Sequence, residues 1–143
     1  MWYITMKTIK LFLYMSILTL VLFGAESLLS EVLKMYQKDE LKNNYSALEL
    51  LKDEAQNGNT NAAFLLATAY KNGKAGVVDI NRAIYWYKVS SENGDADAML
   101  MLGWLYYKEP KNLAINLKKA RYWFKKAASH GVDEAVEMLE LLR

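Results

Sequence analysis

Residues 62–94 read AAFLLATAYKNGKAGVVDINRAIYWYKVSSENG, and residues 98–131 read AMLMLGWLYYKEPKNLAINLKKARYWFKKAASHG. The two stretches carry small and aromatic residues in the same order, which indicates two copies of one unit. The glycines at positions 58, 94 and 131 are separated by 36 and 37 residues. A period of this length is typical of helical hairpins that stack side by side, each completing the core of the next.

The apolar residues of each copy follow a helical rhythm. Ala62, Leu66 and Tyr70 are four residues apart and so share one helix face. The same reasoning predicts a first helix at about 60–72 and a second at about 80–93, with the spaced glycines closing helices just past their ends. Polar residues ahead of the apolar runs predict the N-caps, which are Thr60, Asp79, Asp95 and Asn116.

These residues resemble the Sel1-like repeat family, a relative of the tetratricopeptide repeats. The shared pattern is an alanine, a Leu-Gly or Leu-Ala pair, a tyrosine, a Gly-rich loop with an acidic residue, and an Ala-x-x-Trp-aromatic segment. The resemblance implies an all-α fold, a short right-handed α-α superhelix of tetratricopeptide-like hairpins. The loop from Lys108 to Leu117 departs from the pattern, because it lacks glycine, contains Pro110 and has Asn116 at the acidic position.

The repeat pattern divides the chain. Residues 59–94 and 95–131 are predicted as full Sel1-like repeats, and residues 132–143 as a C-terminal capping helix. Residues 28–58 are predicted as a degenerate first repeat or N-terminal cap, because Leu29, Val32, Leu33 and Tyr36 recur at helical spacing and an Ala-x-x-Leu-Leu segment follows at residues 47–51.

Residues 1–27 have the features of a signal peptide. Lys7 and Lys10 precede an apolar run that ends in small residues, and cleavage after Ser27 would follow. Met6 is an alternative start to Met1. The other readings are an uncleaved inner-membrane anchor and a buried core helix. The apolar run of residues 11–25 is 15 residues long, shorter than the roughly 20 that span a bilayer.

The amino-acid composition excludes several kinds of site and partner. The chain of 143 residues has no cysteine and a single histidine, His130, which excludes disulfides, thiolate metal sites and His-rich metal sites. Its 18 basic and 16 acidic residues are too balanced to suggest nucleic-acid binding. We therefore expect no cofactor, no nucleic acid and, once the signal is removed, no membrane association.

No catalytic motif is present, and we expect a protein that is not an enzyme. His130 precedes Gly131 at a predicted helix end, where it would complement the helix dipole. Four carboxylates lie at helix starts, which is also favourable: Asp95, Asp97, Asp133 and Glu134. Some Sel1-like proteins are linked with β-lactamase activity, but those are cysteine-rich. A hydrolase is retained only as an alternative.

A helical wheel of the first helices predicts a partner surface. Relative to the inward face, one side of each helix points away from its own hairpin, and in tetratricopeptide-like stacks that side lines the concave surface. The predicted partner-binding residues are Phe64, Thr68, Leu100, Trp104 and Tyr107. The alternative is that neighbouring first helices or the N-terminal helix cover them. Tyr85, Tyr122, Arg121, Lys125 and Lys126 are predicted on the outer side, as a solvated face or a second binding surface.

The expected function is therefore that of a periplasmic or secreted protein–protein interaction module. A rigid, curved, aromatic surface binds a partner with little ordering entropy. The array is short, so we expect a monomer with one protein partner. By analogy within the family, an immunity protein that neutralises a phospholipase-type bacterial toxin is the second hypothesis.

Overall fold

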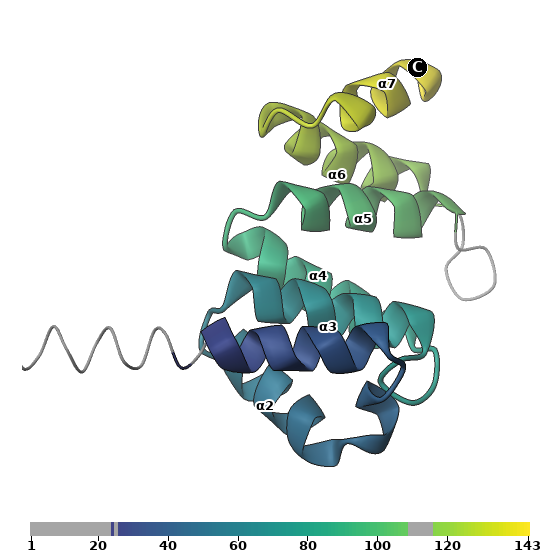
Figure 1. Ribbon diagram of the computed structural model, residues 1–143. Helices are drawn as coiled ribbons and strands as arrows, with labels where there is room; N and C mark the ends of the chain where they lie inside the picture. The colour runs from purple at the N-terminus through teal and green to yellow at the C-terminus, as the bar shows by residue number, and fades with distance from the viewer. Residues whose placement is uncertain (1–23, 25, 109–115) are drawn as a thin grey trace, which may run out of the picture.

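The computed structural model describes residue 24, residues 26–108 and residues 116–143 (Figure 1). Within these ranges the secondary structure is helical. A helix covers residues 26–37 (the 26–37 helix), followed by the 3-10 helix η1 (Leu41–Asn43) and by α2 (Tyr45–Gln56), α3 (Thr60–Asn72), α4 (Ile80–Glu92), α5 (Ala96–Lys108), α6 (Leu117–Ser129) and α7 (Asp133–Leu141). Each α-helix from α2 onward packs on the next in chain order. The all-α array of sequential hairpins is confirmed.

The helix boundaries follow from capping residues. The side chains of Asp79, Asp95 and Asn116 accept hydrogen bonds from backbone N–H groups at the starts of α4, α5 and α6, as predicted. The predicted cap at Thr60 is wrong by one residue. Asn59 caps α3 by accepting from the Ala62 N–H at 3.2 Å, and Thr60 is the first helical residue. Asparagine and threonine both favour this position, so the sequence did not distinguish them.

Gly58, Gly94 and Gly131 close the turns between repeats. Their φ angles are +89°, +91° and +85°, in the left-handed region that residues with a Cβ rarely adopt. Each follows the end of a second helix directly, so the chain reverses and starts the next hairpin within a few residues. The spacing of glycines in the sequence is thus the spacing of the hairpins in space.

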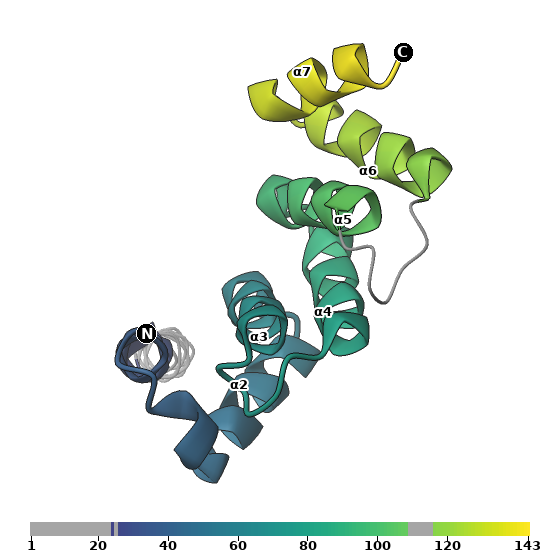
Figure 2. The ribbon, with the colours of Figure 1, turned by 90° about the vertical axis from the view of Figure 1, so that its right-hand side faces the viewer.

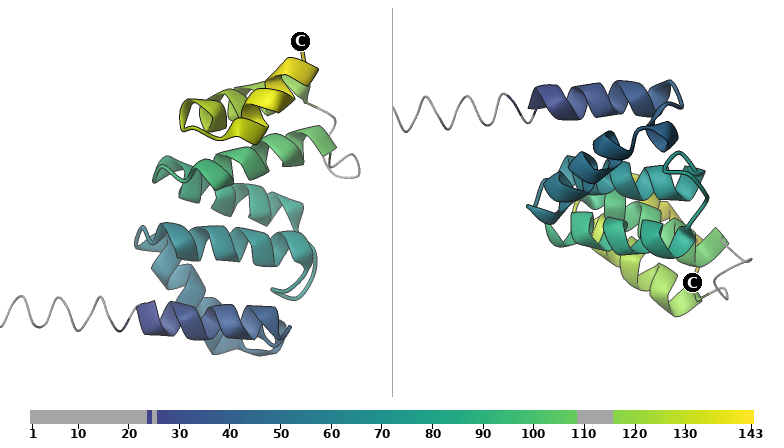
Figure 3. Two further views of the ribbon diagram at one scale, coloured as in Figure 1. Left: turned by 45° about the horizontal axis from the view of Figure 1, so that its top comes forward. Right: turned by 90° about the horizontal axis from the view of Figure 1, so that it is seen from below.

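The helices form two rows along a curve. Figure 2 shows the 26–37 helix, α3, α5 and α7 following one another on the inner side of the bend, and α2, α4 and α6 on the outer side. We call these the inner row and the outer row. Figure 3 shows the 26–37 helix lying beside α3 at one end of the stack.

The core runs between the rows. Tyr87 and Phe124 are fully buried at equivalent positions of α4 and α6, and Leu66 and Leu102 are buried with them. Gly103 has an added role in α5. A Cβ built on it would lie 2.5 Å from Phe124, so only glycine lets these two helices approach as they do. Ser90 is buried in α4 and donates to the Asp95 carboxyl at 2.6 Å, which ties the first repeat to the cap of the second.

Two predicted segments fall largely outside the described residues. These are the signal peptide of residues 1–27 and the loop after α5, of which residues 109–115 are not described. In the ranges that are described, no helix combines the length and apolar character needed to cross a membrane.

Candidate functional site

Two of the hollows that border the inner row contain predicted partner residues. One is a groove between the 26–37 helix and α3, and the other is a pocket where α3, α5 and α7 meet. Both are open to solvent. The groove is lined mainly by apolar and aromatic side chains, whereas the pocket combines such side chains with two lysines and a glutamate. They are the parts of the inner surface where a partner could bury side chains.

The groove is the larger hollow, with a volume of about 600 Å³. Leu29 and Leu33 form one wall, and Phe64 and Leu65 of α3 form the other. Polar groups rim it, including the side chain of Thr68 and the carboxyl of Glu26. Such a channel fits a row of apolar side chains from a helix or an extended segment.

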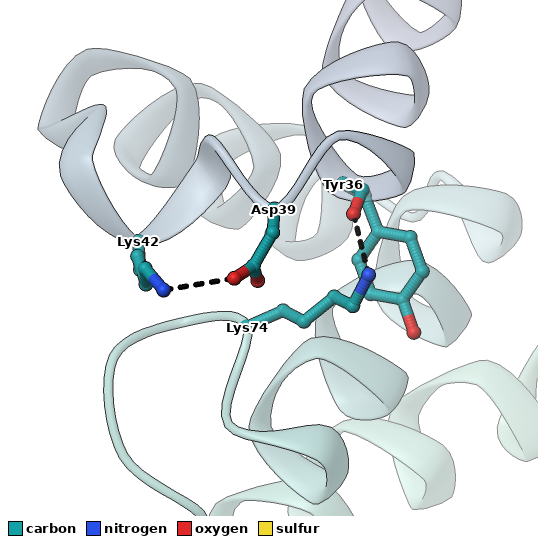
Figure 4. A network of polar contacts seen from close by, with 4 residues as sticks. All are labelled: Tyr36, Asp39, Lys42 and Lys74. Carbon is teal, nitrogen blue, oxygen red and sulfur yellow. Dashed lines mark hydrogen bonds and ion pairs between the residues drawn. The ribbon is translucent and has the colours of Figure 1, made fainter.

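A set of polar contacts holds the groove wall in place (Figure 4). The Lys74 ammonium, in the loop between α3 and α4, donates to the Tyr36 carbonyl at 2.9 Å and lies 4.6 Å from the centre of its ring. Asn72 donates to the Tyr36 hydroxyl at 2.9 Å. Tyr36 ends the 26–37 helix, so these bonds fix the position of that helix relative to α3.

The turn after the 26–37 helix carries a charge pair of its own. Asp39 has a φ of +62°, and its carboxylate accepts a hydrogen bond from Lys42 at 2.8 Å. This hydrogen bond and the Lys42 charge, with the more distant Lys74 charge, lower the pKa of Asp39 from its ordinary value. The pair is exposed and so adds little to stability. The turn itself is closed by backbone hydrogen bonds, from the Asp39 N–H to the Tyr36 carbonyl at 3.2 Å and from the Glu40 N–H to the Met35 carbonyl at 2.9 Å.

Phe64 and Thr68 are backed by a fixed tyrosine. The Phe64 ring packs edge-to-face on Tyr87, with the ring centres 5.4 Å apart. The Thr68 hydroxyl donates to the Phe64 carbonyl at 2.9 Å and lies 2.9 Å from the Tyr87 hydroxyl. Since Thr68 has one hydroxyl hydrogen, Tyr87 is the donor in the second bond. Burial raises the pKa of Tyr87.

Trp104 forms the centre of the second hollow. Its indole N–H donates to Glu134 of α7 at 2.8 Å, and the Lys108 ammonium lies 3.8 Å from its ring centre. The ring also packs edge-to-face on Tyr107 and on buried Phe124, at 5.8 and 5.6 Å. These contacts hold the indole in one orientation. The pocket has a volume of about 360 Å³ and also includes Lys71 and Met101.

The structure separates the five predicted partner residues into three places. Phe64 and Thr68 line the groove, and Trp104, with Tyr107 packed on it, forms the pocket. These four are half-buried, so neighbouring helices cover them in part. Leu100 differs from its expected position, because it is 6% exposed and belongs to the core. The wheel treated one hairpin alone, whereas α5 packs against both α4 and α6.

Other residues of the hollows were missed as site residues. Leu29, Leu33 and Tyr36 share a predicted helix face, but only the stack shows that this face borders Phe64. Lys71, Lys108 and Glu134 come from three helices and meet around Trp104. No local sequence signal could have joined them, because their proximity depends on how successive hairpins pack.

Asp95 and His130, two ionisable residues of the sequence analysis, form hydrogen bonds at helix ends. The Asp95 carboxyl accepts from two N–H groups at the start of α5 and from Ser90. His130 Nδ1 lies 2.9 Å from the Lys126 carbonyl, at the end of α6. Over the described ranges, no group of three or more histidine and carboxylate side chains is placed to hold a metal ion.

Comparisons with known proteins agree on the family. A sequence profile of the Sel1 repeat matches residues 60–95 and 96–132. The solved Sel1 repeat protein of Oxalobacter formigenes is 30% identical, with a TM-score of 0.54, over 62% of this chain and 66% of its own. A protective antigen of uropathogenic Escherichia coli with an SLR fold is 30% identical, with a TM-score of 0.61, over 74% of this chain and 23% of its own.

A third solved structure supports the fold alone. Cysteine rich protein B of Helicobacter pylori is 23% identical, with a TM-score of 0.60, over 81% of this chain and 95% of its own. The chain spans only part of the first two proteins, and nothing about their activity transfers through these matches. A search of curated proteins by sequence gave no match.

Proposed function

Because the chain belongs to the Sel1 repeat family, we propose that it is an exported protein–protein interaction module that binds one partner on its inner row. The observation that carries this proposal is the pair of hollows on the same side of the stack. Phe64 and Thr68 line one, and Trp104 lines the other with Tyr107 packed against its ring. The apolar run of residues 11–25, behind two lysines, supports a periplasmic or secreted location.

The geometry favours a partner that inserts apolar side chains into the groove and a further side chain beside Trp104. The indole is already held by Glu134 and Lys108, so binding immobilises little that is not already ordered. Tryptophan and tyrosine are common at the centres of protein interfaces for this reason. Lys71 and Lys108 border the pocket, so we expect an acidic or neutral group of the partner there.

The alternative of a hydrolase has less support. The Asp95 carboxyl is occupied as a helix cap, and the Glu134 carboxyl accepts the Trp104 N–H. A nucleophile held beside a general base, the arrangement that covalent hydrolysis uses, is not found at these two carboxyls. We therefore propose a role in binding rather than in catalysis.

The test is affinity capture from a cell-envelope extract of the source organism with the full chain as bait. We expect a protein that Trp104→Ala captures about tenfold less well than the unmodified chain, a typical loss for an interface centre. The control is Tyr85→Ala, because Tyr85 is an exposed aromatic of the outer row. Circular dichroism checks that both variants remain helical. A partner bound equally by both variants would place binding elsewhere.

The identity of the captured protein decides between the two partner classes that the sequence leaves open. A secreted phospholipase-type toxin encoded beside this gene would favour the immunity hypothesis. An endogenous envelope protein would favour a scaffold. Turnover of hydrolase substrates by the purified chain, lost on changing His130, would instead support the enzymatic alternative.

A further inference from the structure

The outer face of α6 is strongly basic. The helix contains five cations and no carboxylate, and all five are exposed: Lys118, Lys119, Arg121, Lys125 and Lys126. In the part of the chain that the structure describes, none of them forms an ion pair within 4.0 Å. Arg121 donates to the Leu142 carbonyl, which carries no formal charge. None of the five cations of this helix is thus directly paired with a carboxylate among the described residues.

The matching helix of the first repeat shows that the fold does not require these cations. Where α6 has Lys118, Arg121 and Lys126, α4 has asparagine, isoleucine and valine. On α4, Arg82 is paired with Asp79 at 3.2 Å, and Glu92 stands where α6 has a serine. The buried alanine and aromatic positions are nevertheless the same in both helices. Packing therefore explains the shared residues and leaves the basic surplus of α6 unexplained.

An aromatic ring lies within the basic face. Tyr122 is 53% exposed, and its ring packs edge-to-face on Trp123 with centres 5.1 Å apart. The Lys126 ammonium lies 5.4 Å from the Tyr122 ring centre and 5.3 Å from that of Trp123. Tyr122 is consequently a supported apolar platform surrounded by positive charge.

We propose that the outer face of α6 is a second binding surface, for a short acidic segment of a protein. Carboxylates of the segment interact with cations of this face, and one apolar side chain packs on Tyr122. The cations from Lys118 to Lys126 extend over about 12 Å along the helix axis, which an extended segment of roughly four residues covers. The surface lies on the outer row, so it is independent of the inner-row binding proposed above.

The neighbouring helix favours a protein segment over an anionic bilayer. Packed against α6, α7 has four exposed carboxylates and no basic residue: Asp133, Glu134, Glu137 and Glu140. A bilayer is a broad negative surface that would approach both helices and be repelled by α7. A narrow acidic segment can remain on α6, within the roughly 10 Å over which its charge acts at 0.1 M salt.

The test uses a fluorescein-labelled oligo-glutamate peptide with one central leucine, and follows its binding to the full chain by anisotropy. Lys125 and Lys88 occupy equivalent places in α6 and α4, and both are exposed. The pair Lys125→Glu and Lys88→Glu therefore changes net charge equally. We expect Lys125→Glu to weaken binding about tenfold and Lys88→Glu by less than about twofold, because only Lys125 has four further cations on its helix.

A second matched pair tests the aromatic platform. Tyr122→Ser is expected to weaken peptide binding about threefold, and Tyr85→Ser to leave it unchanged, since a partly buried aromatic contact adds to the charge pairing. Equal losses in both members of each pair would overturn the proposal, because binding would then follow net charge alone. Failure of the peptide to bind would also overturn it. So would Lys125-dependent binding of phosphatidylglycerol vesicles or of duplex DNA in place of the peptide. Loss of the inner-row partner on Trp104→Ala, or its retention, does not bear on these outcomes.

Discussion

The hairpin α3–α4 and the hairpin α5–α6 are the same unit built with two different interiors. Thr68 and Tyr87 face each other in the first and share a hydrogen bond. Trp104 and Phe124 occupy the equivalent places in the second and pack ring against ring at 5.6 Å. One pair is joined by hydroxyl groups and the other by aromatic contact, yet the helices take the same arrangement.

The two hairpins also differ at buried positions where neighbouring helices approach closely. Ala67 in α3 becomes Gly103 in α5, and the loss of the methyl group makes room for Phe124. Ser90 in α4 becomes Ala127 in α6, both fully buried, so a hydroxyl that bonds Asp95 in the first repeat has no counterpart in the second. Buried positions have therefore changed together, whereas the outer faces differ freely in charge. The comparison indicates that the fold constrains the buried positions and leaves the charge of the outer faces free to vary.

The largest loss of stability is expected at Gly103, where the second hairpin has no room for the alanine of the first. Gly103→Ala places a methyl group against the fully buried Phe124 ring and should lower the free energy of unfolding by about 2 kcal/mol. The reverse exchange, Ala67→Gly, should cost only about 1 kcal/mol, because it adds backbone freedom without a clash. Urea denaturation measures both. A Gly103→Ala protein as stable as the original would mean that the α5–α6 contact is loose.

The next effect concerns the link between the repeats. Ser90→Ala copies the alanine of the second repeat and should fit without strain, but it removes the one hydroxyl hydrogen, which lies between the Asp95 carboxyl at 2.6 Å and the Thr60 carbonyl at 3.1 Å. We expect a loss of about 1.5 kcal/mol in the free energy of unfolding, as for a buried bond to a carboxylate. Amide exchange at the start of α5 should accelerate in parallel. Unchanged exchange there would show that Asp95 caps the helix unaided.

The smallest effect is expected for Tyr87→Phe, which gives the first hairpin the phenylalanine found at the equivalent place in the second. Tyr87→Phe removes the donor to Thr68 and should cost about 1 kcal/mol near neutral pH. Burial raises the pKa of Tyr87 above its ordinary value of 10.0, so the folded chain keeps the phenol proton after the unfolded chain has lost it. The stabilisation that comes from burying the protonated Tyr87 side chain is complete below pH 10 and declines as the pH rises through the raised pKa. Denaturation at increasing pH should therefore show a shallower alkaline loss for Tyr87→Phe, and identical losses would argue against burial as the cause.

The sequence by itself determined the repeat and most of its boundaries. Periodic alanine, leucine and aromatic residues report which face of each helix is buried, and glycines at a fixed spacing report where the chain turns. These are local properties, set by helix geometry and by the conformations open to each residue. The sequence predicts the cap of α3 at Thr60, whereas the structure has it at Asn59. This is a small local error, because both residue types serve that position.

Only the tertiary structure decided which of the predicted surface residues reach solvent. Leu100 lies in the core because α5 has neighbours on two sides, and Trp104 gains its fixed orientation from Glu134, which is 30 residues away. The groove beside Phe64 exists because Lys74 and Asn72 hold the 26–37 helix against α3. Each of these depends on the packing of one hairpin on another. A residue's place within its own helix follows from nearby sequence, but its exposure depends on chain that folds back from far along the sequence.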